Sequence, residues 1–558
     1  MQKSNLKLGE LLLFSGKITK EQLNEALEDQ KTSKMKLGEV IVSKGWLSLD
    51  DIIEALETQL GFPKVDLSKY EINSNVATLI PESIVRKYKL IAIDKKDDML
   101  LVAMIDPLNF VAIDDIRLFT KMEVMPCLAY GADLDQVIDR YYSSFFTRKT
   151  LDELSDVFLP TEEESAEEEM LEVATAPIVK LVNSIIEQAM RSNASDIHIE
   201  PSHNDIRVRF RIDGDLTEIM VLPKSNLSPI VTRVKIIGRM DIAEKRIPQD
   251  GRVEMKFNDR EIDLRISTLP TVYGEKIVLR ILDKSNFNFT KEKLGFSKDN
   301  LDKLNKMIAQ PYGMLLVTGP TGSGKTTTLY TILRELNVES KNVITVEDPV
   351  EYKLKGINQV QVNVKAGLTF ASGLRSILRQ DPDTIMIGEI RDAETAEIAV
   401  RAAITGHLVL STLHTNDSPS TVARLVDMGL EPYLVSSAVI GIISQRLVKL
   451  LCPKCKEKYI ASDSEKRILG IEGDNEVTLY KPVGCNSCNN GYKGRSAVHE
   501  VMLVNESIRR LINTGANTDD IRSQALKDGM TTLLQSASDL ALKGDTSFEE
   551  IMRAGYTL

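Results

Sequence analysis

The stretch from Gly319 to Thr326, with the sequence GPTGSGKT, constrains the fold of this chain more than any other segment. It fits the pattern G-x-x-x-x-G-K-[ST], follows the apolar run 314–317 and precedes a helical pattern at 327–333. In such a strand, loop and helix arrangement, backbone N–H groups and the helix dipole hold a phosphate. The sequence therefore predicts a nucleotide-binding α/β sheet. A glycine-rich turn that binds nothing is the alternative, and the complete motif argues against it.

We expect the phosphates of ATP to contact this loop and the first turn of the helix that follows it. The predicted nucleotide-binding residues are Gly319, Pro320, Thr321, Gly322, Ser323, Gly324, Lys325, Thr326 and Thr327. Within this set, Lys325 can reach the β- and γ-phosphates, and the hydroxyl of Thr326 can bind Mg²⁺.

Polar side chains follow three other predicted strands. The apolar run 343–346 ends at Glu347, the run 385–387 is followed by Gly388 and Glu389, and the run 408–410 leads to His414. Ligands of an open α/β sheet lie at the carboxyl ends of its strands, so we expect these three ends to converge on Lys325. One carboxylate would then orient or deprotonate the attacking water, and the other would hold Mg²⁺.

Four of the five cysteines form two C-x-x-C pairs, Cys452 with Cys455 and Cys485 with Cys488. Four thiolates can close a tetrahedral structural Zn²⁺ site without an open position for catalysis. A thioredoxin-type redox pair is the alternative, but two pairs together favour zinc. Five cysteines in a chain of this length are not a disulfide framework.

An internal repeat lies at the N-terminus, where residues 7–30 and 36–59 align without a gap. Each copy predicts a short helix, a glycine turn and a second helix, the latter capped by Thr19 or Ser48. The repeat resembles the tandem cyclic-di-GMP-binding module of many secretion and pilus ATPases, in which each motif opens with Arg-Leu-Gly. The resemblance implies these ligand contacts: Lys7, Leu8, Gly9, Gln30, Lys36, Leu37, Gly38 and Gln59. Lysine keeps the charge of arginine but loses its planar stacking face, so a structural module that binds no ligand is the alternative.

Three further segments precede the nucleotide-binding core. Residues 63–150 predict a small α/β domain, 151–172 a solvated acidic linker, and 173–290 a second mixed α/β domain. Within 173–290 an alternating strand places Arg207, Arg209 and Arg211 on one face. Such a row is either a solvated face or a contact for a phosphate.

Residues 170–558 resemble the secretion ATPase superfamily that powers type II secretion and type IV pilus assembly. The phosphate loop, the acidic box at 347–351, the box at 385–392 and the histidine box at 407–414 carry this resemblance. It implies a RecA-like core over 291–558, with a zinc insertion at about 451–495 and a helical C-terminus. A PAS-like domain would occupy 173–290, and the helical module would occupy 1–62.

The same resemblance implies roles for single residues. Glu347 would be the catalytic base, Glu389 the carboxylate on the Mg²⁺ side, and His414 a sensor of the γ-phosphate. Arginines of the preceding domain would reach the nucleotide within a hexamer, Arg209 first and Arg211 second. Retraction ATPases of the superfamily generally lack the four cysteines, so the motif is typical of assembly ATPases.

Composition limits the remaining alternatives. The chain has 70 Lys and Arg against 81 Asp and Glu, a net charge of −11, and only 5% aromatic residues, which argues against a nucleic-acid translocase. It contains no apolar run of about 18 residues, so we expect a cytoplasmic protein without a direct membrane span. The resemblance to the secretion ATPases implies a homohexameric ATPase that extends type IV pili through an inner-membrane platform protein. A type II secretion motor and a nucleotide sensor with little turnover are the alternatives.

Overall fold

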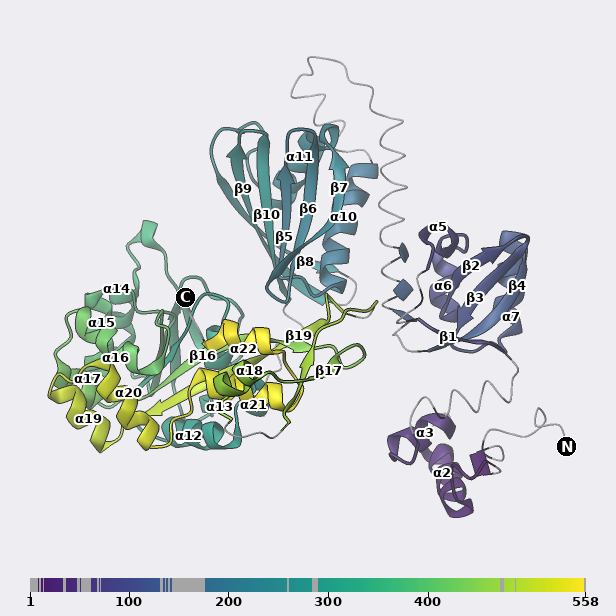
Figure 1. Cartoon of the computed structure of the whole chain (residues 1–558). Coiled ribbons are helices and arrows are strands. Elements are labelled where there is room, and N and C mark those ends of the chain that lie inside the picture. Colours follow the sequence, from purple (N-terminus) through teal and green to yellow (C-terminus); the bar gives the residue numbers. More distant parts are fainter. Residues whose placement is uncertain are drawn as a thin grey trace.

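The computed structural model contains three separate larger sheets, whose strands span residues 64–130, 196–283 and 313–503 (Figure 1). It describes residues 9–555 except 10–11, 14, 34–36, 48–50, 52–61, 68–69, 71, 131–133, 136, 139–140, 143–175, 258–259, 284–289, 472–475 and 487. The predicted acidic linker at 151–172 lies outside the described residues. The mixed α/β class expected from the sequence is confirmed.

Two helices of the N-terminal repeat are described, α2 (Lys20–Ser33) and α3 (Leu37–Ser43). Thr19 caps α2 as predicted, because its hydroxyl accepts the backbone N–H of Gln22 at 3.2 Å while the Gln22 side chain accepts the N–H of Thr19 at 2.8 Å. The turn glycines of the two copies, Gly16 and Gly45, have equivalent backbones with φ of 69° and 71°. At this turn, the repeat in sequence is also a repeat in backbone conformation.

The first sheet has the strand order β1-β4-β3-β2. Its elements are β1 (Lys64–Asp66), α5 (Ser74–Ala77), α6 (Glu82–Tyr88), β2 (Leu90–Lys96), β3 (Met99–Met104), α7 (Phe110–Thr120) and β4 (Glu123–Tyr130). The buried residues of β2 and β3 form its core together with α6 and α7. Residues 90–119 thus form two strands followed by a helix.

The second sheet has six strands in the order β7-β6-β5-β10-β9-β8. Its elements are α10 (Ala176–Arg191), β5 (Asp196–Pro201), β6 (Asp205–Ile212), β7 (Asp215–Pro223), η2 (Lys224–Asn226), α11 (Leu227–Gly238), β8 (Gln249–Phe257), β9 (Arg260–Thr271) and β10 (Gly274–Asp283). Alternate side chains pack against α10 and α11 in one apolar cluster. The opposite face of β5, β6 and β10 carries several charged side chains, among them Glu200, Arg209 and Arg280.

The third sheet has the order β13-β12-β14-β15-β11-β16-β19, in which every neighbouring pair except β16 and β19 is parallel. Its strands are β11 (Gly313–Thr318), β12 (Val343–Glu347), β13 (Asn358–Gln361), β14 (Thr384–Ile387), β15 (Leu408–Leu413), β16 (Val439–Leu451) and β19 (Tyr492–Leu503). The associated helices are η3 (Lys291–Leu294), α12 (Lys298–Ile308), α13 (Lys325–Leu336), η4 (Val364–Ala366), α14 (Phe370–Ile377), α15 (Ala393–Ile404), α16 (Ser418–Asp427) and α17 (Pro432–Ala438). Strands β11, β12, β14 and β15 are buried along their whole length, as expected where apolar clusters cover both faces.

The C-terminal part is mainly helical. It contains β17 (Glu457–Ile460), α18 (Asp463–Ile468), β18 (Thr478–Lys481), α19 (Glu506–Asn513), α20 (Thr518–Lys527), α21 (Leu533–Leu542) and α22 (Phe548–Gly555). Helices α21 and α22 pack with β18 and with β16 in a small apolar cluster.

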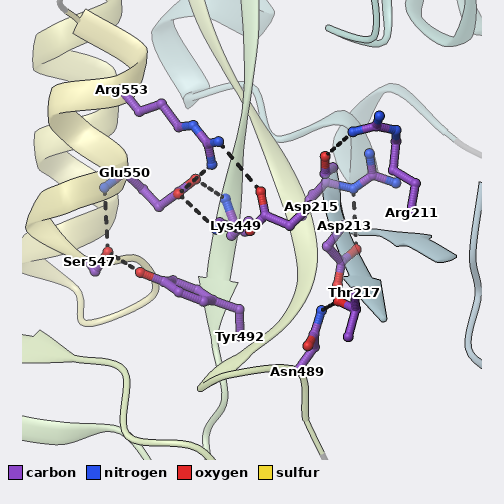
Figure 2. A network of polar contacts seen from close by, with 12 residues as sticks. Arg211, Asp213, Asp215, Thr217, Lys449, Asn489, Tyr492, Ser547, Glu550 and Arg553 are labelled. Atoms are coloured by element: carbon purple, nitrogen blue, oxygen red, sulfur yellow. Dashed lines mark hydrogen bonds and ion pairs between the residues drawn. The ribbon is translucent and has the colours of Figure 1, made fainter. Parts of the chain in front are cut away.

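The turn between β6 and β7 contacts the core through opposite charges, and Figure 2 shows this network. Asp215 accepts a hydrogen bond from the Lys449 ammonium at 2.7 Å and lies 3.5 Å from the Arg553 guanidinium. Asp213 accepts the backbone N–H of Gly494 at 3.0 Å and pairs with Arg495 at 3.3 Å. These pairs join the six-stranded domain to the core of the same chain.

Candidate active site

The ends of four core strands lie at one edge of the third sheet. In the parallel register Thr318 is opposite Leu413, Ile387 is opposite Ser411, and Val346 is opposite Ile387. The phosphate loop and the polar residues after β12, β14 and β15 therefore share this edge, as the sequence predicted. The hydroxyl of Thr318 donates to the backbone oxygen of Thr415 at 2.9 Å and so joins the loop to the segment after β15.

The phosphate loop connects β11 to α13, and the ammonium of Lys325 lies inside it. This ammonium donates hydrogen bonds to the backbone oxygens of Gly319 at 2.8 Å and Pro320 at 3.0 Å. Burial lowers the pKa of Lys325 to about 8, although the negative charge of Glu389 acts in the opposite direction. A half-buried cation with two carbonyl partners can exchange them for phosphate oxygens, which are stronger acceptors.

Two neighbouring residues of β16 contact this edge: Gln445 bonds to the phosphate loop, and Arg446 bonds to the segment after β15. The Gln445 amide donates to the Ser323 backbone oxygen at 2.7 Å and accepts the Thr328 hydroxyl at 2.7 Å. Arg446 donates to the Asn416 backbone oxygen at 3.2 Å, and burial lowers its pKa. Neither residue was predicted from the sequence. Their signal was the polar run 444–446 between the apolar runs 439–443 and 447–448 of one strand.

Glu389 follows β14 and is paired with the side chains of Arg391 and His414. Its carboxylate lies 2.6 Å from the Arg391 guanidinium and 3.4 Å from Nε2 of His414. The side chain of His414 is 51% exposed, so it is not an ordinary core histidine at a strand end. The structure thus brings Lys325, Glu389 and His414 together.

Glu347, the last residue of β12, is only 3% exposed. Its Oε1 accepts hydrogen bonds from the Thr345 hydroxyl at 2.6 Å and from the Gln359 amide at 3.1 Å. Its Oε2 accepts the hydroxyl of Tyr330, which lies on α13. Tyr330 and Gln359 were also missed by the sequence analysis, because neither stands in a motif.

The donors at this edge fit a Mg²⁺-bound nucleotide. Thr326 is exposed in the first turn of α13, and Glu389 is an oxygen ligand of the kind that Mg²⁺ prefers. Bound Mg²⁺ would neutralise charge on the β- and γ-phosphates. Lys325 supplies a second positive charge beside them.

Carboxylates of the two neighbouring strands pair with the predicted arginine row on β6, in which Arg207 lies 4.0 Å from Glu218 of β7. Arg209 donates to Glu200 at 2.7 Å, and Arg211 lies 3.8 Å from Asp196 and donates to the Gly214 backbone oxygen at 2.7 Å. Burial would raise the pKa of Glu200, but Lys276 and Arg209 lower it below its ordinary value. Within one chain, the row is thus explained by cross-strand ion pairs. Contact of Arg209 or Arg211 with a nucleotide stays a prediction.

The four paired cysteines form one cluster, in which the sulfur atoms all lie within 4.8 Å of one another. The Sγ–Sγ distances are 3.9 Å for Cys452 and Cys485, 3.7 Å for Cys455 and Cys488, and 3.6 Å for Cys485 and Cys488. A tetrahedral zinc site with metal–sulfur bonds of about 2.3 Å has sulfur–sulfur edges of about 3.8 Å. The cluster therefore fits Zn²⁺ in size and in donor type.

Comparison with known proteins agrees with this geometry. A family model described as type II/IV secretion system protein matches residues 172–553. The chain is 42% identical over 557 residues to the type IV pilus assembly ATPase PilB of Myxococcus xanthus, and the match covers 98% of each protein. The chain belongs to the type II/IV secretion system protein family. It is an ATPase, as predicted.

Two further comparisons describe this secretion ATPase more closely. The type II secretion system protein E of Xanthomonas campestris pv. campestris is 41% identical to it over 505 residues, which cover 88% of each protein. The structure of the Legionella pneumophila ATPase DotB matches with a TM-score of 0.51 and 21% identity, over 70% of this chain and 97% of that one. At this identity, the structural match shows a shared fold and no more.

A second family model, the MshEN domain, matches residues 60–147 of the secretion ATPase. This range contains the four-stranded sheet and begins directly after the repeat at 7–59. The structure describes only half of the predicted cyclic-di-GMP contacts. Those described are Gly9, Gln30, Leu37 and Gly38, and those outside the described residues are Lys7, Leu8, Lys36 and Gln59. A Cβ atom on Gly9 would come within 2.6 Å of the end of the Leu23 side chain, so this glycine packs closely against Leu23. Among the described helices, none combines the length and the apolar character needed to cross a membrane.

Proposed function

We propose that this ATPase is a cytoplasmic homohexamer that uses ATP hydrolysis to extend type IV pili through an inner-membrane platform protein. The observation that supports the pilus assignment is the extent of the similarity. The match to the Myxococcus xanthus pilus assembly ATPase covers 98% of both chains, whereas the match to the Xanthomonas type II secretion protein covers 88% of each. A type II secretion motor is the second candidate, because the two relatives are almost equally identical to this chain.

In the proposed hydrolytic step, the residue at each strand end has one role. Glu347 takes a proton from the attacking water, whose oxygen bonds to the γ-phosphorus while the bond from that phosphorus to the bridging oxygen breaks. ADP leaves with the electron pair of that bond, and Lys325 stabilises the charge. Glu389 and Thr326 hold Mg²⁺, and His414 senses the γ-phosphate through its pair with Glu389.

Three further sites complete the proposal. Arg209 and Arg211 of one subunit exchange their carboxylate partners for the nucleotide of a neighbouring subunit. The four cysteines hold a structural Zn²⁺ with no open position, so this metal stabilises the fold and takes no part in hydrolysis. The repeat at 7–59 binds cyclic-di-GMP and regulates the motor.

Partner binding tests the pilus assignment. The full-length chain is co-purified separately with the platform proteins encoded by the pilus and type II secretion operons of the same genome. We expect a stable complex with the pilus protein and stimulation of ATP turnover in that complex only. A complex with the secretion protein alone would support the second candidate instead.

Phosphate release tests the motor assignment itself. We expect Glu347→Gln to lower release by at least about 100-fold, because a general base contributes about 10² to 10⁴ in rate. Binding of ATP should persist in this variant. Unchanged phosphate release would refute the role of Glu347 and favour a nucleotide sensor.

A further inference from the structure

Tyr330 links the phosphate-binding helix to the proposed base. It lies on α13, the helix that begins with Lys325, and its side chain is completely buried. Its hydroxyl donates to Oε2 of Glu347 and accepts the backbone N–H of Glu351 at 3.2 Å. One buried hydroxyl therefore contacts both ends of the acidic box that follows β12.

The hydrogen bonds to Glu347 leave one acceptor position open. An ionised carboxylate offers about four lone-pair positions, two on each oxygen. Within the described part of the chain, Thr345 and Gln359 fill the two positions of Oε1, and Tyr330 fills one position of Oε2. The remaining position is on Oε2, the oxygen that Tyr330 holds.

Gln359 is itself fixed, so it restrains Glu347 from the other side. Its amide nitrogen also donates to the Tyr352 backbone oxygen at 2.9 Å, and its amide oxygen accepts the backbone N–H of Leu354 at 2.6 Å. The two donors on Oε1 hold one side of the carboxylate, and the Tyr330 hydroxyl on Oε2 holds the other. Together these bonds limit rotation of the carboxylate. Loss of that bond would free the oxygen with the open position.

We propose that Tyr330 is a positioning residue that aims the open lone pair of Glu347 Oε2 at the water attacking the γ-phosphate. This inference rests on the proposed role of Glu347 as the base. The proton of the water goes to Oε2, and Tyr330 keeps its own proton throughout. Burial, followed by the charge of Glu347, raises the pKa of Tyr330 far above its ordinary value, so the phenol stays a donor.

A purely structural explanation exists, because a buried tyrosine hydroxyl usually finds some partner. The two explanations differ in how Tyr330 depends on Glu347. If the Tyr330 hydroxyl is purely structural, its removal would affect stability and nucleotide binding whichever side chain occupies position 347. A positioning hydroxyl affects turnover, and only while a functional carboxylate is present.

The test uses the purified full-length chain and its Tyr330→Phe variant, which removes one oxygen and keeps the ring. Thr331→Val is the matched control, because it removes a buried hydroxyl from the same helix whose hydrogen bond, at 2.8 Å, goes to the backbone oxygen of Thr327. For each variant, kcat and KM for Mg-ATP are measured, together with the affinity for a fluorescent ATP analogue and the thermal unfolding temperature.

We expect Tyr330→Phe to lower kcat by about tenfold or more while KM and analogue affinity change less than about twofold. Thr331→Val should keep the kcat of the wild type. In a Glu347→Gln background, adding Tyr330→Phe should leave the residual rate unchanged, because the group that it positions is already absent.

Three results would overturn the inference: an unchanged kcat in Tyr330→Phe, a loss seen mainly in KM or analogue affinity, or the same fold-loss in both backgrounds. If Glu347→Gln alone turned over like the wild type, the proposed function would fail as well. If Glu347→Gln is inactive but Tyr330→Phe is not, only the inference about Tyr330 fails.

Discussion

Replacing Gly319 with alanine should damage the nucleotide-binding core more than replacing Gly322. Both glycines have positive φ, 145° and 79°. A Cβ atom on Gly319 would stand 2.4 Å from the backbone oxygen of Gln445, whereas a Cβ atom on Gly322 would meet nothing within 4 Å. The pair therefore separates backbone strain, which both variants share, from a collision with β16, which only Gly319→Ala produces.

The expected magnitudes follow from these two contributions. An alanine at positive φ costs about 1–2 kcal/mol in either variant. The Gly319 variant must also displace the loop or β16, and such overpacking costs about 1–3 kcal/mol more. For a domain of roughly 150–250 residues, each kcal/mol lowers Tm by about 2–4 °C, so Gly319→Ala should melt about 2–12 °C below Gly322→Ala.

Calorimetry of the nucleotide-free, full-length proteins measures this difference in melting temperature. The unfolding transition of the core is identified as the one that Mg-ATP shifts to higher temperature in the wild type. Titration with an ATP analogue should also show weaker binding to Gly319→Ala than to the wild type, because the displaced loop no longer surrounds the phosphates. Equal melting temperatures of the two variants would refute the reasoning. They would mean that the loop relaxes away from β16 without cost.

Three other predictions concern the remaining sites. The pKa of Lys325 is about 8 without nucleotide, and its charged form binds phosphate, so ATP affinity should fall as pH rises through that value; calorimetry at pH 9 should give binding about tenfold weaker than at pH 7, and equal affinities would contradict this. Cys452→Ser should reduce bound zinc below one ion per chain and lower Tm, while Cys127→Ser, a buried cysteine outside the cluster, should keep its zinc; metal analysis of both variants is the measurement. Calorimetry with cyclic-di-GMP should show binding to the wild type that Lys7→Ala combined with Lys36→Ala abolishes, and heat from the double variant equal to that of the wild type would place the ligand elsewhere.

The sequence predicted the parts of the site that depend on residues close together in the chain. The phosphate loop from Gly319 to Thr326 is a local conformation set by glycine positions and by the helix that follows. In each C-x-x-C pair, the two intervening residues likewise set the spacing between the two cysteines. The carboxyl ends of β12, β14 and β15 could be grouped because parallel strands place such ends at one edge.

Residues that act across the sheet could not be predicted in this way. Gln445 contacts Ser323 because β16 pairs with β11, although 122 positions separate the two residues. The arginines of β6 looked like an unbalanced row until the register of β5 placed Glu200 and Asp196 beside Arg209 and Arg211. Strand order and register depend on how the whole core packs, and the local pattern does not encode them.

Glu347 shows what the sequence and the tertiary structure each contribute. Its place at the end of an apolar run was evident in the sequence, and that place alone made it a candidate base. Only the tertiary structure brings the Tyr330 hydroxyl from α13 and the Gln359 amide from β13 to its two oxygens. The sequence by itself indicated which groups are candidates for the chemistry, because motifs are local. Packing decided which way those groups face, because orientation depends on hydrogen bonds between elements distant in sequence.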